Sequence, residues 1–169
     1  MSTPLRELAL RPFLAADTPA LAAIFAASVE LLTADDYDVG QQSAWAALAD
    51  DEEALAARFG SQLTLVATVD GEPVGFASLR GTDHIDMLYV HPAMARRGVA
   101  TSLVDALEKL AGARGAAALT VDASDTAKPF FDARGYQAKH RNAIAVGGEW
   151  LGNVSMQKQL AAAPASKIQ

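Results

Sequence analysis

Residues 85–110 read IDMLYVHPAMARRGVATSLVDALEKL, and the rest of the chain is organised around them. It starts with an apolar run typical of a strand, which a His-Pro pair interrupts before the chain reaches Gly98. From Ala100 to Ala111, apolar residues recur three and four positions apart, as they do on the buried face of an amphipathic helix. The stretch therefore predicts a strand, a glycine turn and a helix, in that order.

The glycine turn is a candidate anion site. A glycine at the mouth of a helix lets backbone N–H groups approach a ligand closely, and the helix dipole favours negative charge there. Arg96 and Arg97 stand directly before Gly98 and add positive charge. The pattern indicates a phosphate-bearing ligand, although so short a motif also fits an ordinary strand-to-helix loop with a solvated arginine pair.

The composition is that of one soluble domain. The chain has 169 residues, about half of them apolar, a net charge of −6 and no cysteine. The acidic balance argues against a nucleic-acid-binding surface, and the lack of cysteine excludes disulfides, thiolate metal sites and a cysteine nucleophile. By the sequence, no apolar run reaches the length needed to span a bilayer. We expect a cytoplasmic protein without metal or membrane association, a monomer or homodimer, with one domain over 1–160 and a tail over 161–169.

The order of the remaining segments predicts a mixed α/β fold. Asp70-Gly71-Glu72 separates two β-prone runs and favours a tight hairpin. The strand after the central helix, AAALTV at 116–121, reads as buried on both faces. The strand–helix–strand order predicts one parallel pair in an otherwise antiparallel sheet. We expect about seven strands (8–12, 63–69, 73–79, 84–90, 116–121, 137–146, 149–159) and about four helices (18–32, 41–59 in two pieces, 100–111, 126–134).

Several motifs resemble those of the GCN5-related N-acetyltransferase (GNAT) superfamily, and the resemblance runs from Leu8 to Leu160. They are LYVHP at 88–92, RRGVA at 96–100, AKPFF at 127–131 and GY at 135–136. More narrowly, QSAW at 42–45, IDML at 85–88 and TVDAS at 120–124 resemble the YafP-like bacterial branch. The resemblance implies a twisted sheet whose parallel pair splays around acetyl-CoA. It also implies direct transfer of the acetyl group, within a ternary complex, to a primary amine of a small molecule or peptide.

The resemblance also places the cofactor. The diphosphate of coenzyme A is expected on N–H groups of the turn, and the pantetheine arm along the preceding strand. There, an N–H near Leu88 or Tyr89 would stabilise the oxyanion of the tetrahedral intermediate. Ala95 departs from the Gln or Arg usual in the family. The implied cofactor-binding residues are Leu88, Tyr89, Val90, Ala95, Arg96, Arg97, Gly98, Val99, Ala100, Thr101, Ser124, Ala127, Lys128 and Phe131.

A second departure concerns the general acid. Phe131 stands where many members carry the tyrosine that protonates the leaving thiolate. The usual acid is therefore missing at that place. Water, or a hydroxyl group of Tyr89, Tyr136 or Ser124, would have to serve instead.

His84 and Asp86 are the candidate bases for the attacking amine. His84 aligns with the strand position at which histone-acetylating members of the superfamily place a glutamate. Because side chains alternate across a strand, both residues are expected on the same face as Leu88, near the reacting carbonyl. The sequence does not distinguish between them, and a solvated histidine with an ion-paired Asp86 also fits.

The resemblance implies that the first helices cover the amine pocket. Tyr37 and Trp45 are the candidate substrate residues, and the acids at 35, 36 and 38 are candidates to attract a cationic substrate. A polar loop at 35–38 and a core position for Trp45 are the competing interpretations. Two other functions also stay open: a sensor that binds acetyl-CoA without turnover, suggested by Phe131, and a partner-binding domain with a vestigial pocket.

Overall fold

The fold is built on one sheet, whose strands run in the order β1-β2-β3-β4-β5-β7-β6. The computed structural model describes residues 7–160, so the expected tail lies outside the described residues. Neighbouring strands are antiparallel except β4 and β5, which confirms the predicted sheet with one parallel pair. The strands are β1 (Ala9–Pro12), β2 (Leu63–Val69), β3 (Glu72–Arg80), β4 (His84–Val90), β5 (Ala118–Ser124), β6 (Gln137–Val146) and β7 (Glu149–Gln159).

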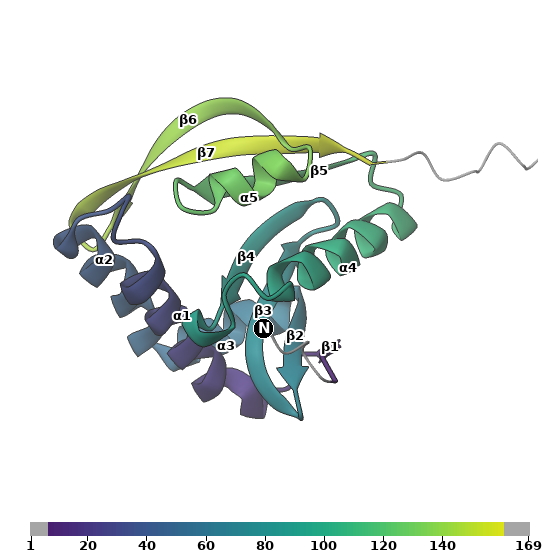
Figure 1. The fold of residues 1–169 in the computed structure, drawn as a ribbon, viewed down its shortest axis with the longest axis horizontal. Helices are drawn as coiled ribbons and strands as arrows, with labels where there is room; N and C mark the ends of the chain where they lie inside the picture. Colours follow the sequence, from purple (N-terminus) through teal and green to yellow (C-terminus); the bar gives the residue numbers. More distant parts are fainter. Residues whose placement is uncertain (1–6, 161–169) are drawn as a thin grey trace, which may run out of the picture.

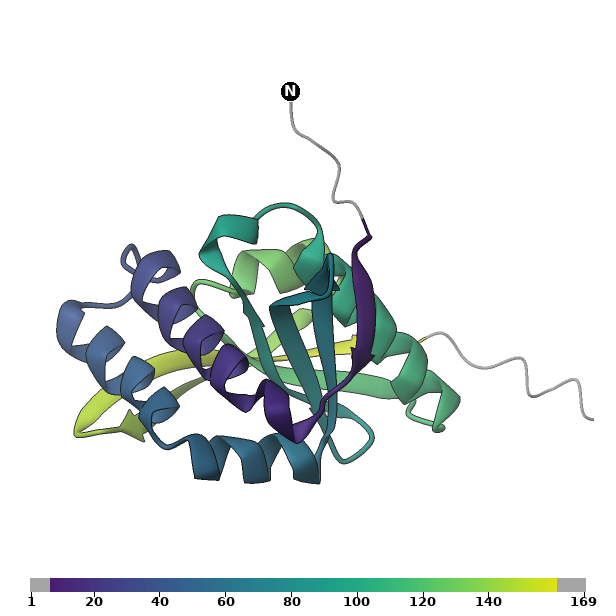
Figure 2. The ribbon, with the colours of Figure 1, turned by 90° about the horizontal axis from the view of Figure 1, so that it is seen from below.

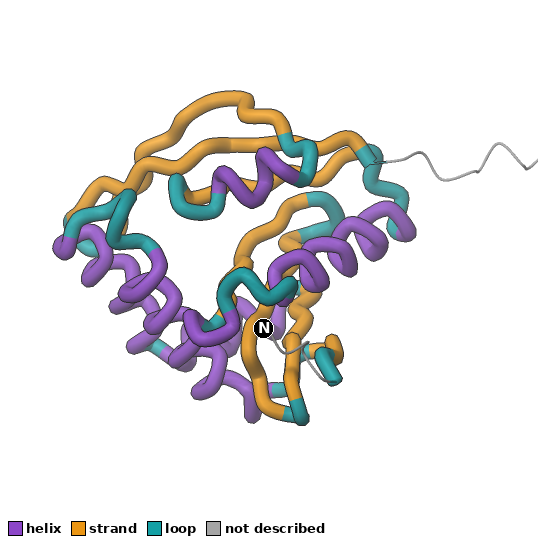
Figure 3. Tube along the Cα trace, in the orientation of Figure 1, coloured by secondary structure: helices purple, strands orange, loops and turns teal. Residues whose placement is uncertain are grey.

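Helices cover both faces of this sheet. Figure 1 shows α1, α2 and α3 together on one side and α4 on the other, with the β6–β7 hairpin arching above α5. Figure 2 shows α1 and α4 flanking the central strands, and Figure 3 separates helices from strands by colour. The α-helices are α1 (Thr18–Leu32), α2 (Val39–Ala46), α3 (Glu52–Ser61), α4 (Val99–Ala113) and α5 (Lys128–Ala133); short 3-10 turns are η1 (Ala15–Asp17), η2 (Ala47–Asp50) and η3 (Pro92–Met94).

The sheet separates two apolar cores. Leu103, Val104 and Leu107 of α4 are fully buried against one face, as the periodicity of residues 100–111 predicts. On the other face, α1 and α3 pack around Phe25, Phe59 and their neighbours. Each face of the central strands is therefore anchored by its own helical layer.

The segment Ala15–Leu32 is long and apolar enough to cross a membrane by length and composition alone. The expectation that no run reaches this length is therefore wrong. Leu21, Phe25 and Val29 of this segment are nevertheless buried in the core beneath α1. Its apolar character is explained by this packing.

Replacing Leu107 with alanine is expected to lower the free energy of unfolding by about 2–5 kcal/mol, because a fully buried leucine would leave a cavity between α4 and the sheet. Chemical denaturation measures this change. Leu31→Ala is the control, because Leu31 is 70% exposed on α1 and its truncation should cost well under half as much. Equal losses in the two variants would contradict the packing described here.

One prediction about β5 is wrong. Leu119, Val121 and Ala123 are buried in the α4 core, but Asp122 is exposed and Thr120 and Ser124 are only partly buried on the opposite face. The strand is therefore buried on one face. The other face is polar, and two of its residues, Asp122 and Ser124, line the cavity described below.

A β-bulge in β4 corrects a second prediction. Two consecutive residues of β3 pair with Met87 and Ile85, so Asp86 is an extra residue between them. Ile85 and Leu88 both pack into the α4 core, whereas Met87 packs into the α1–α3 core and Asp86 bonds to α3. His84 and Asp86 therefore do not share a face with Leu88, because the bulge reverses the alternation between them.

The parallel pair is short. Only His84–Thr120 and Ile85–Val121 are paired between β4 and β5. Beyond these residues, the two strands continue without further pairing to each other in the described structure. The sheet is thus splayed at its centre, and a cavity opens between the two strands.

Candidate active site

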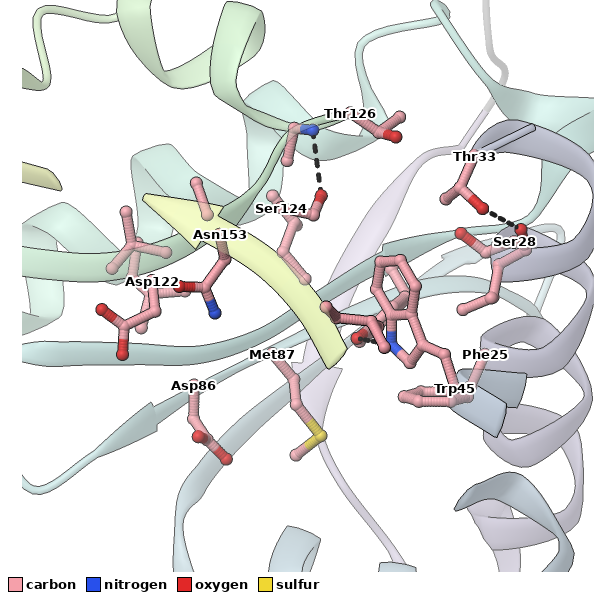
Figure 4. A pocket seen from close by; sticks show the side chains of 18 of the residues that line it. Phe25, Ser28, Thr33, Trp45, Asp86, Met87, Asp122, Ser124, Thr126 and Asn153 are labelled. Atoms are coloured by element: carbon pink, nitrogen blue, oxygen red, sulfur yellow. Dashed lines mark hydrogen bonds between the residues drawn. The ribbon is translucent and has the colours of Figure 1, made fainter. Parts of the chain in front are cut away.

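A cavity of about 480 Å³ lies where β4 and β5 separate. Its walls come from these strands, from α1 and the α2–η2 segment, and from the β6–β7 hairpin. Figure 4 shows the cavity from close by, with Asp86 and Asp122 toward one side and Trp45, Ser28 and Thr33 toward the other. Elements distant in sequence therefore meet around one space.

The splayed strands form one arm of this cavity. Leu88, Tyr89 and Val90 line it from β4, and Ala123 and Ser124 line it from β5. An extended chain lying here could use main-chain groups of β4 as an added strand does. The arm thus suits a long, flexible ligand better than a compact one.

The predicted anion turn lies at the start of α4. Gly98 is the N-cap and has φ of +86°, and Arg96 has φ of +60°, which is rare for a residue with a side chain. Left-handed residues in such a turn aim successive N–H groups to one side and form an anion-binding concavity. The first turn of α4 adds N–H groups at Val99 to Thr101, because the helical bonding begins at the N–H of Ser102, 3.0 Å from the carbonyl oxygen of Gly98.

The predicted cofactor residues divide into three groups. One group lines the cavity: Leu88, Tyr89, Val90, Ala100, Ser124, Ala127 and Phe131. A second group forms the turn and the helix start beside it: Ala95, Arg96, Arg97, Gly98, Val99 and Thr101. Lys128 stands apart, because its ammonium group is 2.8 Å from the Asp132 carboxylate.

His84 lines the cavity beside β5. Its Nδ1 lies 2.7 Å from Oγ1 of Thr120, and its Nε2 lies 3.9 Å from the Asp122 carboxylate. Burial, followed by the positive charge of Arg80, lowers the pKa of His84 below its ordinary value. The imidazole is therefore neutral near pH 7 and can accept a proton.

Asp86 also lines the cavity, but its carboxylate is already occupied. It accepts hydrogen bonds from Nε of Arg58 at 2.7 Å and from Nε2 of Gln62 at 2.8 Å, and Arg80 lies 3.5 Å away. Burial opposes ionisation, but the bonds from Arg58 and Gln62 outweigh it and lower the pKa of Asp86. A carboxylate held in this way is a weak base.

The aromatic pair predicted for the substrate lies together in the cavity wall. The rings of Tyr37 and Trp45 meet edge to face, with centroids 5.3 Å apart. The Tyr37 hydroxyl donates to the carbonyl oxygen of Gly152 at 2.6 Å and accepts from the N–H of Asp125 at 2.9 Å. Trp45 donates its indole N–H to the Tyr89 hydroxyl at 3.2 Å.

The acids near Tyr37 lie elsewhere. Asp36 accepts a hydrogen bond from the Thr126 hydroxyl, and Asp38 caps α2 by accepting from the N–H of Gln41. Neither residue lines the cavity, and neither does Asp35. They are loop and cap residues, as the competing interpretation holds.

The three candidate hydroxyl groups differ in position. Tyr136 does not line the cavity and donates to Glu108 at 2.9 Å, which removes it as an acid for chemistry there. Tyr89 lines the cavity, and burial raises its pKa to about 12. Ser124 also lines it and accepts from the N–H of Ala127 at 3.0 Å, so its own proton remains available to a ligand. Phe131 is buried and packs edge to face on Tyr136.

Sequence reasoning missed Thr120, Asp122 and Arg58, which contact the two candidate bases. Thr120 and Asp122 alternate with Ser124 along β5, a period-two polar pattern within an apolar run. That alternation could have marked the polar face of β5, of which Asp122 and Ser124 line the cavity. Within residues 7–160, no three His, Asp or Glu side chains are grouped so that they could hold a metal ion.

The chain is similar to known acetyltransferases. A family model described as an acetyltransferase (GNAT) domain matches residues 33–160. The uncharacterized N-acetyltransferase YafP of Escherichia coli K12 is 36% identical over 153 residues, covering 90% of this chain and 97% of YafP.

Solved structures of acetyltransferases are also similar to this chain. The crystal structure of a GCN5-related N-acetyltransferase, also described as a class-II aminotransferase, from Rhodopseudomonas palustris has a TM-score of 0.91 and 61% identity, over 95% of this chain and 100% of that one. The PaiA N-acetyltransferase of Thermoplasma acidophilum, solved with coenzyme A, has a TM-score of 0.74 and 16% identity, over 90% and 99% of the two chains, which shows a shared fold.

Proposed function

Because the chain belongs to the GNAT acetyltransferase family, we propose that it transfers the acetyl group of acetyl-CoA to a primary amine of a small molecule or peptide. The observation that carries this proposal is the cavity between the splayed strands, which has the turn at Gly98 beside one arm and His84 in its wall. The coenzyme A complex of the PaiA enzyme, which shares the fold, supports acetyl-CoA as the donor.

The diphosphate of acetyl-CoA would bind the N–H groups from Gly98 to Thr101, with the exposed side chains of Arg96 and Arg97 nearby. The pantetheine arm would lie between β4 and β5. Its thioester carbonyl would then reach the main chain near Leu88, just after the β-bulge, where an N–H group would stabilise the oxyanion.

In the chemical step, the amine nitrogen attacks the thioester carbon and loses a proton to Nε2 of His84. The tetrahedral intermediate then collapses, and the carbon–sulfur bond breaks. The hydroxyl group of Ser124 donates a hydrogen bond to the departing thiolate, which takes its proton from the imidazolium or from water. Asp86, tied to Arg58 and Gln62, would position the bulge instead of acting as the base.

Thr120 supports His84 as the base by fixing its tautomer. Oγ1 of Thr120 lies 3.2 Å from the carbonyl oxygen of Asp83, which can only accept, so the threonine proton is directed there. Thr120 must then accept from Nδ1–H of His84, which leaves the lone pair of Nε2 free. Asp122, 3.9 Å from Nε2, would stabilise the imidazolium once it forms.

Thr120→Val is expected to lower kcat about tenfold, because the lost hydrogen bond frees the imidazole to adopt the other tautomer. Thr120→Ser keeps the acceptor oxygen and should restore most of the activity. Steady-state rates and ¹⁵N NMR of the histidine ring measure both effects. If Thr120→Val leaves the tautomer unchanged, the arrangement of protons described here is wrong.

The proposed function is tested by incubating the protein with acetyl-CoA and a panel of primary amines. Release of thiol that depends on an amine, with the matching amide detected by mass spectrometry, is the expected result. Thermal stabilisation by coenzyme A without turnover on any amine would instead favour the sensor. Ternary-complex kinetics should give intersecting initial-rate lines, because the chain has no cysteine to carry a covalent acetyl group.

We further propose that the enzyme is cytoplasmic and acts as a monomer or homodimer. Its catalytic unit would be the domain over 1–160. The burial of α1 supports its assignment as a core helix of the domain and not as a membrane span. The bacterial sources of the relatives also fit this assignment.

A further inference from the structure

We propose that the acceptor is a primary amine carried on an uncharged apolar body, such as an aryl or branched alkyl group, and not a polyamine or a lysine side chain. This inference rests on the proposed function and concerns the part of the cavity away from the splayed strands. Two observations carry it: the apolar side chains at the rim, and the position of the two carboxylates on the opposite side of the cavity.

The rim of the cavity exposes large apolar side chains. Leu32 ends α1, Leu48 lies in η2 and Ile144 lies in β6, and they are 37%, 44% and 43% exposed. Three separate elements therefore present apolar surface around the same opening. An apolar group bound there would remove this surface from water, which favours binding.

The aromatic wall behind the rim offers rings and few polar atoms. The Tyr37 hydroxyl has protein partners on both sides, and the indole N–H of Trp45 is bonded to Tyr89. Thr33 donates to the carbonyl oxygen of Val29 and accepts from Gln42. Ser28 adds a hydroxyl group to an otherwise apolar surface.

The apolar side of the cavity has no carboxylate among its described lining residues. The two carboxylates of the cavity, Asp86 and Asp122, lie on the side opposite Trp45, Ser28 and Thr33 (Figure 4). Asp86 is held by both Arg58 and Arg80, and Asp122 lies beside His84 and accepts from Ser155. A second ammonium group on an acceptor bound against the apolar side would lose its hydration without gaining a partner there.

A pair of simple amines tests this directly. With saturating acetyl-CoA, kcat/KM for 2-phenylethylamine should exceed that for 1,4-diaminobutane by about 100-fold or more, because burying an unpaired ammonium is costly. A peptide with one free lysine should resemble the diamine. Greater activity on the diamine or the peptide would overturn the inference while leaving acetyl transfer established.

Adjacent residues on α1 give a matched pair of variants. Leu32→Lys places a charge at the rim and should lower kcat/KM for 2-phenylethylamine about tenfold or more. Leu31→Lys makes the same substitution outside the cavity, on a side chain that is 70% exposed. It should change kcat/KM for 2-phenylethylamine less than twofold. Equal effects of the two substitutions would contradict a role for the rim.

A third variant is expected to gain activity on the diamine, which poor folding could not explain. Ile144→Asp places a carboxylate among the apolar side chains of the rim and should raise the ratio of diamine to phenylethylamine turnover about tenfold. An unchanged ratio in a folded variant would count against the inference. If no amine supports thiol release although coenzyme A binds, the proposed function itself fails, and this inference fails with it.

Discussion

Replacing His84 with glutamine is expected to lower kcat by about 10²–10⁴-fold, the usual contribution of a general base. Glutamine keeps a side chain of similar reach but cannot take the proton of the attacking amine. Affinity for coenzyme A should change little, because His84 lies at the paired end of β4 and β5, away from the turn at Gly98. Rapid-quench or steady-state rates, with calorimetry for coenzyme A, measure the two quantities separately.

The pH dependence gives an independent check. Burial and Arg80 lower the pKa of His84, so the acid limb of kcat should have its midpoint below about 6.5, the ordinary histidine value. As the pH falls through that midpoint, Nε2 becomes protonated and activity is lost. The limb should be absent in His84→Gln.

Two control variants sharpen this result. His140→Gln changes an exposed histidine on β6 outside the cavity and should leave kcat unchanged. Asp86→Asn should lower kcat far less than His84→Gln, because Asp86 is an ion-paired carboxylate. If His84→Gln retains full activity and Asp86→Asn abolishes it, the base has been assigned to the wrong residue.

The second large effect is expected from Gly98→Glu, which should weaken coenzyme A binding about 100-fold or more through like charge near the diphosphate. The substitution also forces a side chain into φ of +86°, which costs about 1–2 kcal/mol. A Cβ at Gly98 would meet no atom within 4 Å, so crowding by the protein itself contributes little. The loss should therefore come from charge and backbone strain.

Gly98→Asn separates these causes. Asparagine tolerates left-handed geometry better than most residues and carries no charge, so binding should fall much less than in Gly98→Glu. Isothermal titration with coenzyme A compares the variants, and desphospho analogues show which phosphate is involved. Equal affinity of Gly98→Glu and the unmodified protein would mean that the diphosphate does not bind here.

Much of the fold follows from local patterns. The stretch 85–110 gives β4, the turn and α4 because its apolar spacing changes from strand to helix around one glycine. The hairpin at Asp70-Gly71 and the two long C-terminal strands could also be predicted from the local sequence, since tight turns have strong residue preferences. These features depend on residues close together in the chain.

The features that could not be predicted depend on distant residues. The bulge at Asp86 has no local signal, because it arises from how β3 pairs with β4 and how Asp86 meets Arg58 of α3. The role of the polar residues of β5 could not be predicted, because it depends on the contact of Thr120 with His84, which lies 36 positions away in the sequence. The sequence named His84 and Asp86 as candidate bases, but only their hydrogen-bond partners separate their proposed roles.

We propose that acetyl-CoA lies between β4 and β5 with its diphosphate on the turn at Gly98. A crystal structure of the protein with acetyl-CoA is the decisive experiment. We expect phosphate oxygens within hydrogen-bond distance of the N–H groups from Gly98 to Thr101, and a thioester near Leu88 in front of His84. A nucleotide bound elsewhere, or a turn closed to it, would show that this site does not bind the cofactor.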